Sequence, residues 1–90
     1  MIITDQEILE AVGRPIEIRQ VSDGTKCIEI TAEPPRQLWK HDTEEAARAG
    51  LLAAIAARAI GYSTISFRVW PETGSRADGK WSGYARASFS

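Results

Sequence analysis

Apolar residues recur along this chain at two different spacings. Around residues 8–12 and again around 51–60 they repeat every three or four positions, which is the spacing of a helix with one buried face. Over residues 15–33 and 65–89 apolar and polar residues alternate, which is the spacing of a strand with one buried face. The pattern therefore predicts the order helix, two strands, helix, two strands.

The first helix has sequence signals at both ends. Thr4 is placed to cap its N-terminus, and Glu7, three residues later, is placed to accept a hydrogen bond from the Thr4 backbone N–H in return. Gly13 favours the left-handed conformation that ends a helix, and Pro15 prevents the helix from continuing. We therefore expect a short helix between Thr4 and Gly13.

Two strands are expected next, over residues 15–21 and 26–33. The four residues between them, Ser-Asp-Gly-Thr, are typical of a tight turn, so the two strands are predicted to pair as a hairpin. The proline pair at 34–35 ends the second strand, because proline cannot donate a hydrogen bond to a sheet ladder. The residues that follow, 36–41, fit either a loop or a short edge strand.

The second helix is predicted over residues 42–60, where no breaker interrupts the helical pattern before Gly61. Residues 42–45 supply an N-terminal cap and place acidic side chains in the first turn, where the helix dipole favours negative charge.

This second helix is rich in small residues, with eight alanines and Gly50. Small residues permit close packing of the helix on the sheet and against the first helix, because they allow backbones to approach. They also permit close contact with a second copy of the chain or with another partner. The strip that such a homodimer or partner contact would use consists of Ala46, Gly50, Ala54 and Ala57.

The last two strands are predicted to form a second hairpin around a polar loop at residues 71–79. Alternation assigns Ile65, Phe67 and Val69 to the core. In the last strand the core positions are Trp81, Gly83, Ala85, Ala87 and Phe89. The opposite, outward positions of the two strands are Ser66, Arg68, Trp70, Lys80, Ser82, Tyr84, Arg86 and Ser88.

Together these elements predict an α+β domain of two layers, in the order α-β-β-α-β-β. The sheet is expected to be antiparallel and four-stranded, built from two hairpins, with both helices on one of its faces. The opposite face of the sheet is then open to solvent. At 90 residues, the chain is expected to form a single domain, 1–90, with one modest core.

Few side chains are suited to metal binding or catalysis. Cys27 is the single cysteine and His41 the single histidine, so a disulfide within the chain is excluded and a cysteine–histidine zinc site is disfavoured. No carboxylate pair, nucleophile with a base, or phosphate-binding loop appears with useful spacing. We therefore expect a protein without catalytic residues, metal or cofactor.

The N-terminus lacks the basic region and the apolar run of a signal peptide. No stretch approaches the roughly 18 continuous apolar residues that would cross a membrane. The expected location is cytoplasmic, without membrane contact.

The net charge of −1 conceals an uneven distribution. Residues 1–45 carry ten acidic and five basic side chains, whereas residues 46–90 carry two acidic and six basic ones. Six of the seven aromatic residues also lie in the second half. Such asymmetry either marks a binding face or reflects two halves that complement each other within one domain.

The open face of the predicted sheet is the candidate binding surface. Alternation gathers arginine, tryptophan and tyrosine side chains there, with Arg19 and Thr31 as expected neighbours, and these residue types dominate many protein interfaces. The alternative is that the arginines stack on the aromatic rings and merely shield the sheet. The predicted partner-binding residues, which include two basic residues around the polar loop, are Arg68, Trp70, Arg76, Lys80, Tyr84 and Arg86.

Two classes of partner suit such a face. The first is a larger protein or nucleoprotein complex, whose surface this chain would occupy as an inhibitor or adaptor. Small phage-encoded inhibitors of bacterial defence complexes, such as anti-CRISPR proteins, are analogous in size alone. The second is single-stranded RNA or DNA, with bases stacked on Trp70 and Tyr84. A pI near 5.8 counts against this second class, because few unpaired cations are available for phosphates.

Overall fold

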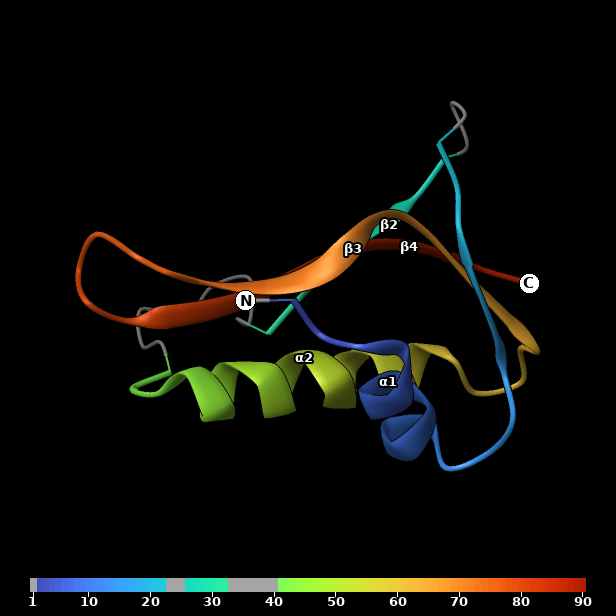
Figure 1. Ribbon diagram of the computed structural model, residues 1–90, viewed down its shortest axis with the longest axis horizontal. Coiled ribbons are helices and arrows are strands. Elements are labelled where there is room, and N and C mark those ends of the chain that lie inside the picture. The colour runs from blue at the N-terminus through green and yellow to red at the C-terminus, as the bar shows by residue number, and fades with distance from the viewer. Residues whose placement is uncertain (1, 23–25, 33–40) are drawn as a thin grey trace.

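The computed structural model describes residues 2–22, 26–32 and 41–90 (Figure 1). Within these residues the helices and strands follow the predicted order and confirm an α+β architecture. The expected loop or edge strand at 36–41 lies outside the described residues except for His41. In chain order the elements are α1 (Asp5–Val12), β1 (Glu17–Gln20), β2 (Ile28–Thr31), α2 (Glu44–Arg58), β3 (Thr64–Ser75) and β4 (Trp81–Phe89).

Both helices begin where the sequence predicts. At α1, the Thr4 side chain accepts a hydrogen bond from the Glu7 N–H, and the Glu7 carboxylate accepts one from the Thr4 N–H, which completes the capping box. Gly13 ends this helix with a φ of 77°. At α2, Thr43 is the N-cap, and its hydroxyl accepts a hydrogen bond from the Ala46 N–H at 3.1 Å. No helix of the described residues is long and apolar enough to cross a membrane.

The strands form one four-stranded mixed sheet in the order β1-β3-β4-β2. The predicted C-terminal hairpin is confirmed, because β3 and β4 pair in antiparallel orientation. The predicted first hairpin is wrong: β1 pairs parallel with β3, whereas β2 pairs antiparallel with β4. The two strands expected to be neighbours therefore lie at opposite edges, and the sheet is not purely antiparallel.

Strand length and apolar content account for this arrangement. β3 and β4 span 12 and 9 residues and bring Ile65, Phe67, Ala85 and Ala87 to the core, whereas β1 and β2 have four residues each. Short strands at the edges leave few backbone groups unpaired. Alternation along the chain identifies the buried side of a strand but carries no information about which strand lies beside it.

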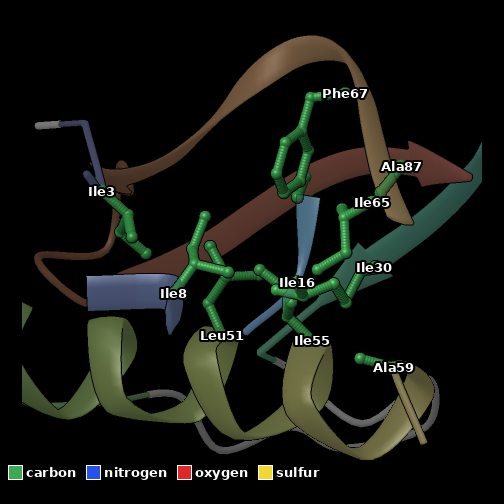
Figure 2. Close-up of a cluster of buried hydrophobic side chains, with 11 residues drawn as sticks. Ile3, Ile8, Ile16, Ile30, Leu51, Ile55, Ala59, Ile65, Phe67 and Ala87 are labelled. Carbon is green, nitrogen blue, oxygen red and sulfur yellow. The ribbon is translucent and has the colours of Figure 1, made fainter. Parts of the chain in front are cut away.

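Both helices lie on one face of the sheet, as predicted (Figure 1). Apolar side chains from the helices and from the strands meet between these two layers, and Figure 2 shows the resulting cluster. Its buried members are Ile3, Ile8, Ile16, Ile30, Leu51, Ile55, Ala59, Ile65, Phe67, Ala85 and Ala87.

β3 is longer than the sequence predicts. It continues to Ser75, so more than half of the polar loop expected at 71–79 belongs to the strand. The connection to β4 shortens to residues 76–80, where the Arg76 N–H donates to the Lys80 carbonyl at 2.7 Å. Hydrogen bonding to β4 thus overrides the polar composition that indicated a loop.

Two β-bulges interrupt the pairing of β3 with β4. Each inserts one extra residue into β3, and each shifts the alternation of its side chains by one position. The sequence pattern beyond Phe67 therefore no longer identifies the face that a side chain occupies. The register pairs that bracket the two bulges are Phe67 with Ala87, Val69 with Arg86, and Glu72 with Tyr84.

The small-residue strip of α2 is split between the interior and the surface. A Cβ placed on Gly50 would lie 3.2 Å from the Ala32 Cβ and 3.2 Å from the His41 Nε2, so Gly50 permits close packing within the molecule. Ala54 packs against the core, whereas Ala46 and Ala57 are exposed. Half of the strip thus serves the packing of α2 on the sheet.

Candidate functional site

The sheet face opposite the helices, here called the open face, is the candidate functional site. β3 rises to a crest in Figure 1 with both helices beneath it, so this face is convex. No helix or strand of the described residues covers it. The charged, aromatic and apolar residues that the pairing register places on it are Ile2, Glu17, Arg19, Glu29, Arg68, Val69, Glu72, Tyr84 and Arg86.

At the centre of the open face, two neighbours hold the side chain of Arg86. Its Nε donates to the Tyr84 hydroxyl at 2.6 Å, and a terminal nitrogen donates to Glu29 Oε1 at 3.2 Å. The Tyr84 hydroxyl donates to the same Glu29 oxygen at 3.4 Å. These contacts, chiefly the one with Tyr84, raise the pKa of Arg86 above its ordinary value. Two neighbours therefore contact the guanidinium although the side chain remains 43% exposed.

The first β-bulge places two successive residues on the open face: Arg68, which alternation also assigned there, and Val69, which alternation wrongly assigned to the core. Val69 pairs with Arg86, and Arg68 is the residue inserted just before it, so the side chains of both lie on the Arg86 side of the sheet. Val69 is 42% exposed. No described residue forms a hydrogen bond or ion pair with the Arg68 guanidinium, which leaves its charge available to a partner.

The second β-bulge turns Trp70 away from the open face, contrary to the prediction. Trp70 and Pro71 together oppose Ala85, which is buried between the sheet and the helices. Pro71 is also fully buried, and the Trp70 ring stacks on the Phe67 ring of the core with 6.4 Å between centroids. The predicted cluster thus keeps its two arginines and its tyrosine but loses its tryptophan.

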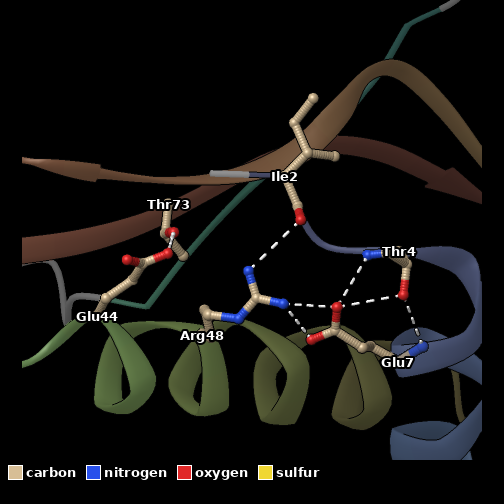
Figure 3. A network of polar contacts seen from close by, with 6 residues as sticks. All are labelled: Ile2, Thr4, Glu7, Glu44, Arg48 and Thr73. Carbon is tan, nitrogen blue, oxygen red and sulfur yellow. Dashed lines mark hydrogen bonds and ion pairs between the residues drawn. The ribbon is translucent and has the colours of Figure 1, made fainter.

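The N-terminal segment adds an apolar side chain to the open face. Ile2 forms an antiparallel bridge with Glu72, and the Ile3 N–H donates to the Pro71 carbonyl at 3.0 Å. Residues paired in this way point to the same side of a sheet. Ile2 is 56% exposed, and Figure 3 shows its side chain directed away from α2.

Acidic and basic side chains on the open face balance one another. Arg19 is paired with Glu17 of the same strand at 2.7 Å, and Arg86 is paired with Glu29. The strands β1 and β2 come from the acidic half of the chain and flank the basic strands β3 and β4. The fold therefore brings Glu29 of the acidic half beside Arg86 of the basic half, which is the complementary arrangement that the sequence left open as an alternative.

Arg76 and Lys80 lie in the turn between β3 and β4, apart from the Arg86 cluster. At about 3.3 Å per residue, this turn is roughly 20 Å along β4 from Arg86. Lys80 forms an ion pair with Asp42, which raises the pKa of Lys80 and lowers the pKa of Asp42. The structure therefore does not join the six predicted residues into one surface.

A separate polar cluster ties the N-terminal segment to α2 (Figure 3). Arg48 donates to both carboxylate oxygens of Glu7 and to the Ile2 carbonyl. These bonds hold the pKa of Glu7 below its ordinary value of 4.5. Beside them, the Thr73 hydroxyl donates to Glu44 at 3.4 Å. Each side chain of this cluster has a polar partner within the molecule, which indicates a structural role.

A shallow depression of about 440 Å³ lies between α1 and the start of β1. The Arg14 guanidinium at its rim donates to the Ala59 carbonyl at 2.5 Å, at the C-terminal end of α2. No cluster of three or more metal-ligating side chains occurs within the described residues. The residues that line the depression are Gln6, Leu9, Glu10, Arg14, Pro15 and Ile16.

Sequence reasoning placed Arg68 and Tyr84 on the same face as Arg86 but did not name Glu29, Val69 or Ile2 there. Thr31, which it named as a neighbour on the open face, lies opposite Tyr84. Glu29 is two residues before Thr31 and therefore lies on the same face of β2, so the alternation of this strand was sufficient to place it there. Val69 and Ile2 had no such signal, because a bulge and a long-range bridge place them. Comparison of the chain with protein-family models, curated proteins and solved structures gave no match.

Proposed function

We propose that this protein is a non-catalytic binding module, an inhibitor or adaptor that occupies the surface of a larger protein or nucleoprotein complex through its open face. The observation that carries the proposal is the cluster of Tyr84, Arg86 and Glu29 at the centre of a convex and uncovered sheet. Tyrosine and arginine are enriched among the residues that dominate binding energies. Because two neighbours already contact Arg86, its immobilisation on binding costs less conformational entropy.

Charge favours a protein partner over a nucleic acid. The register places three arginines, 19, 68 and 86, and three glutamates, 17, 29 and 72, on the open face. Affinity for nucleic acid depends on unpaired cations that replace counterions along the phosphates. Two of these arginines are already neutralised by glutamates, and Trp70, the expected stacking platform for bases, lies against Phe67.

The form of the open face favours a concave partner. The convex open face carries the exposed side chains of Val69 and Ile2, together with Arg68, whose guanidinium has no hydrogen bond or ion pair among the described residues. A groove with an apolar floor and a carboxylate on its wall complements these groups, because it removes apolar surface from water and neutralises the guanidinium. Such a groove requires a partner larger than a short peptide.

Affinity capture from source-cell lysate, quantified by mass spectrometry, tests the proposal. The test variant combines Tyr84→Ala with Arg68→Ala, and the matched control is Arg58→Ala, an exposed arginine on the helical side of the molecule. We expect the test variant to recover at least tenfold less of a captured partner than the wild type does. A tenfold loss corresponds to about 1.4 kcal/mol of binding free energy. The control variant is expected to retain that partner fully.

Equal recovery with the test variant and with the wild type would refute the open face as the binding surface. A second measurement separates the two classes of partner: fluorescence anisotropy with labelled single-stranded RNA and DNA oligonucleotides at low and at high salt. We expect no saturable binding. Tight binding that weakens steeply with salt and is lost in the test variant would replace the proposal with a nucleic-acid-binding function.

A further inference from the structure

β1 forms an outer edge of the sheet to which no strand of the described residues pairs. Within the described residues its only neighbour is β3. The Glu17 N–H donates to the carbonyl of Ser63, just before β3, at 2.9 Å, and the Val21 N–H donates to the Phe67 carbonyl at 2.7 Å. Hydrogen-bonding residues alternate along a strand of a parallel pair. The N–H and C=O groups of Ile16, Ile18 and Gln20 therefore point away from β3, toward the outside of the molecule.

The charged side chains of β1 are arranged so that two antiparallel copies of the strand would place opposite charges beside each other. Glu17 and Arg19 lie on the same face of the strand on either side of Ile18, and both are more than half exposed. If a second β1 lies antiparallel with Ile18 opposite Ile18, each Glu17 faces the Arg19 of the other copy. A shift of this register by two residues in either direction would place like charges opposite each other.

Backbone and side-chain patterns select the same register. The outward groups of Ile18 would form the hydrogen-bonded pair with the Ile18 of the second copy, and those of Ile16 and Gln20 would pair with each other. The Glu17–Arg19 positions then fall at non-hydrogen-bonded pairs, where opposing side chains approach most closely in an antiparallel ladder. A single two-fold axis between the two Ile18 residues satisfies both the backbone pairing and the charge pairing, and an isologous dimer requires such an axis.

We propose that this protein forms a homodimer in which the β1 strands of two copies pair in antiparallel orientation about Ile18. The two sheets join into one continuous sheet across the two-fold axis. Residues 21–22 of the second copy then run beside Arg14 and Pro15, at the rim of the depression next to α1. Because the axis is perpendicular to the sheet, the dimer presents both open faces on the same side.

This proposal is independent of the function assigned to the open face. The dimer contact uses the outer edge of β1, whereas the proposed partner contact uses Arg68, Tyr84 and Arg86 on the inner strands. An edge contact of four or five residues buries less surface than a standard interface of about 1,600 Å². We therefore expect a dimer whose population depends on protein concentration.

Sedimentation equilibrium over a range of protein concentrations tests the proposal. The wild type is expected to approach twice its chain mass of 9.9 kDa as concentration rises. Glu17→Arg and Arg19→Glu each place like charges opposite one another, and each is expected to weaken the dimer at least tenfold. An exposed pair of this kind contributes at most about 1 kcal/mol to folding, so both variants should remain folded.

Mixing the two variants gives the decisive result. Glu17→Arg and Arg19→Glu are each self-repelling, but their charges complement each other across the axis, so an equimolar mixture is expected to recover a dimer. The double variant Glu17→Arg with Arg19→Glu is also expected to dimerise like the wild type. Arg68→Glu, the same charge change on an inner strand, is the matched control and should leave the dimer unchanged.

A monomeric wild type at every concentration would overturn the proposal. So would a dimer that both charge reversals leave intact, because that result would assign the contact to another surface, such as the exposed alanines of α2. Circular dichroism of each variant confirms that a loss of dimer is not a loss of fold. Partner capture by the double variant is a separate readout, since it retains Arg68, Tyr84 and Arg86 and leaves the net charge of the open face unchanged.

Discussion

Gly83 of β4 packs directly against Leu51 of α2, with no room for a side chain between them. A Cβ placed on Gly83 would come within 2.8 Å of the Leu51 Cβ and 3.0 Å of the Ala47 carbonyl oxygen. Both of those residues are fully buried. The close approach of helix and sheet therefore depends on the absence of a side chain at one position in the centre of β4.

We expect Gly83→Ala to destabilise the protein by about 1–3 kcal/mol, because overpacking at a rigid contact forces the helix to shift. Urea unfolding followed by circular dichroism measures the change. The matched control is Gly74→Ala in β3, where an added Cβ would have no atom within 4 Å. Gly74→Ala should leave stability within about 0.5 kcal/mol of the wild type, and equal losses in both variants would contradict the packing argument.

Trp70 is expected to contribute to stability rather than to recognition. Its ring stacks on Phe67, and the residue as a whole is 38% exposed, so truncation removes an aromatic contact and part of a buried apolar surface. We expect Trp70→Ala to lower the free energy of unfolding by about 1–2 kcal/mol. Val69 precedes Trp70 in the chain but lies on the open face, and Val69→Ala should cost less than about 1 kcal/mol. Unchanged stability in Trp70→Ala would indicate that the stacking is dispensable.

The ion pair between Arg48 and Glu7 predicts a pH dependence of stability. Hydrogen bonds from Arg48 lower the pKa of Glu7 below 4.5, so the folded state binds this proton less tightly than the unfolded state. The stabilisation is present above pH 4.5 and is lost as the pH falls through the lowered pKa of Glu7. We expect Arg48→Met to destabilise the protein by about 1 kcal/mol at neutral pH, and by less near pH 3.

Urea unfolding of the wild type and of Arg48→Met at both pH values measures this difference. Arg58→Met, a change of the same kind in the last turn of α2, is the control, and its effect should not depend on the titration of Glu7. A difference between Arg48→Met and the wild type that is the same at both pH values would show that Glu7 is not coupled to Arg48.

The contact between Asp42 and Lys80 is testable through the carboxyl group itself. Lys80 lowers the pKa of Asp42 below its ordinary 3.8, chiefly by a direct hydrogen bond. We expect an NMR titration of the side-chain carboxyl to show this low pKa, and Lys80→Gln to raise it toward 3.8. Added salt should act in the same direction, because both groups are exposed to solvent. An identical Asp42 titration in the wild type and in Lys80→Gln would exclude the pair.

Local chemistry in the sequence was sufficient to predict both helices and the order of the elements. The capping box of Thr4 and Glu7 and the left-handed Gly13 are interactions between residues close in the chain, so they need no tertiary information. Adjacent strands with alternating residues also predicted the C-terminal hairpin, but these signals are not sufficient, because they equally predicted the first hairpin, which does not form.

The candidate site was only partly predictable. Tyr84 and Arg86 follow the unbroken alternation of β4, and they lie on the open face as expected. Trp70 lies beyond a β-bulge in β3, and one inserted residue is enough to move a side chain to the other face. Alternation read from the sequence holds only as far as the ladder stays regular.

The sequence by itself determined which residues form helices and strands and that its two halves differ in charge. Only the tertiary structure decided which strands are neighbours, because pairing depends on long-range hydrogen bonds and on which strands bury the most apolar surface. That choice placed the short strands β1 and β2 at the edges. It thereby set Glu29 beside Arg86 and left the outer edge of β1 unpaired among the described residues.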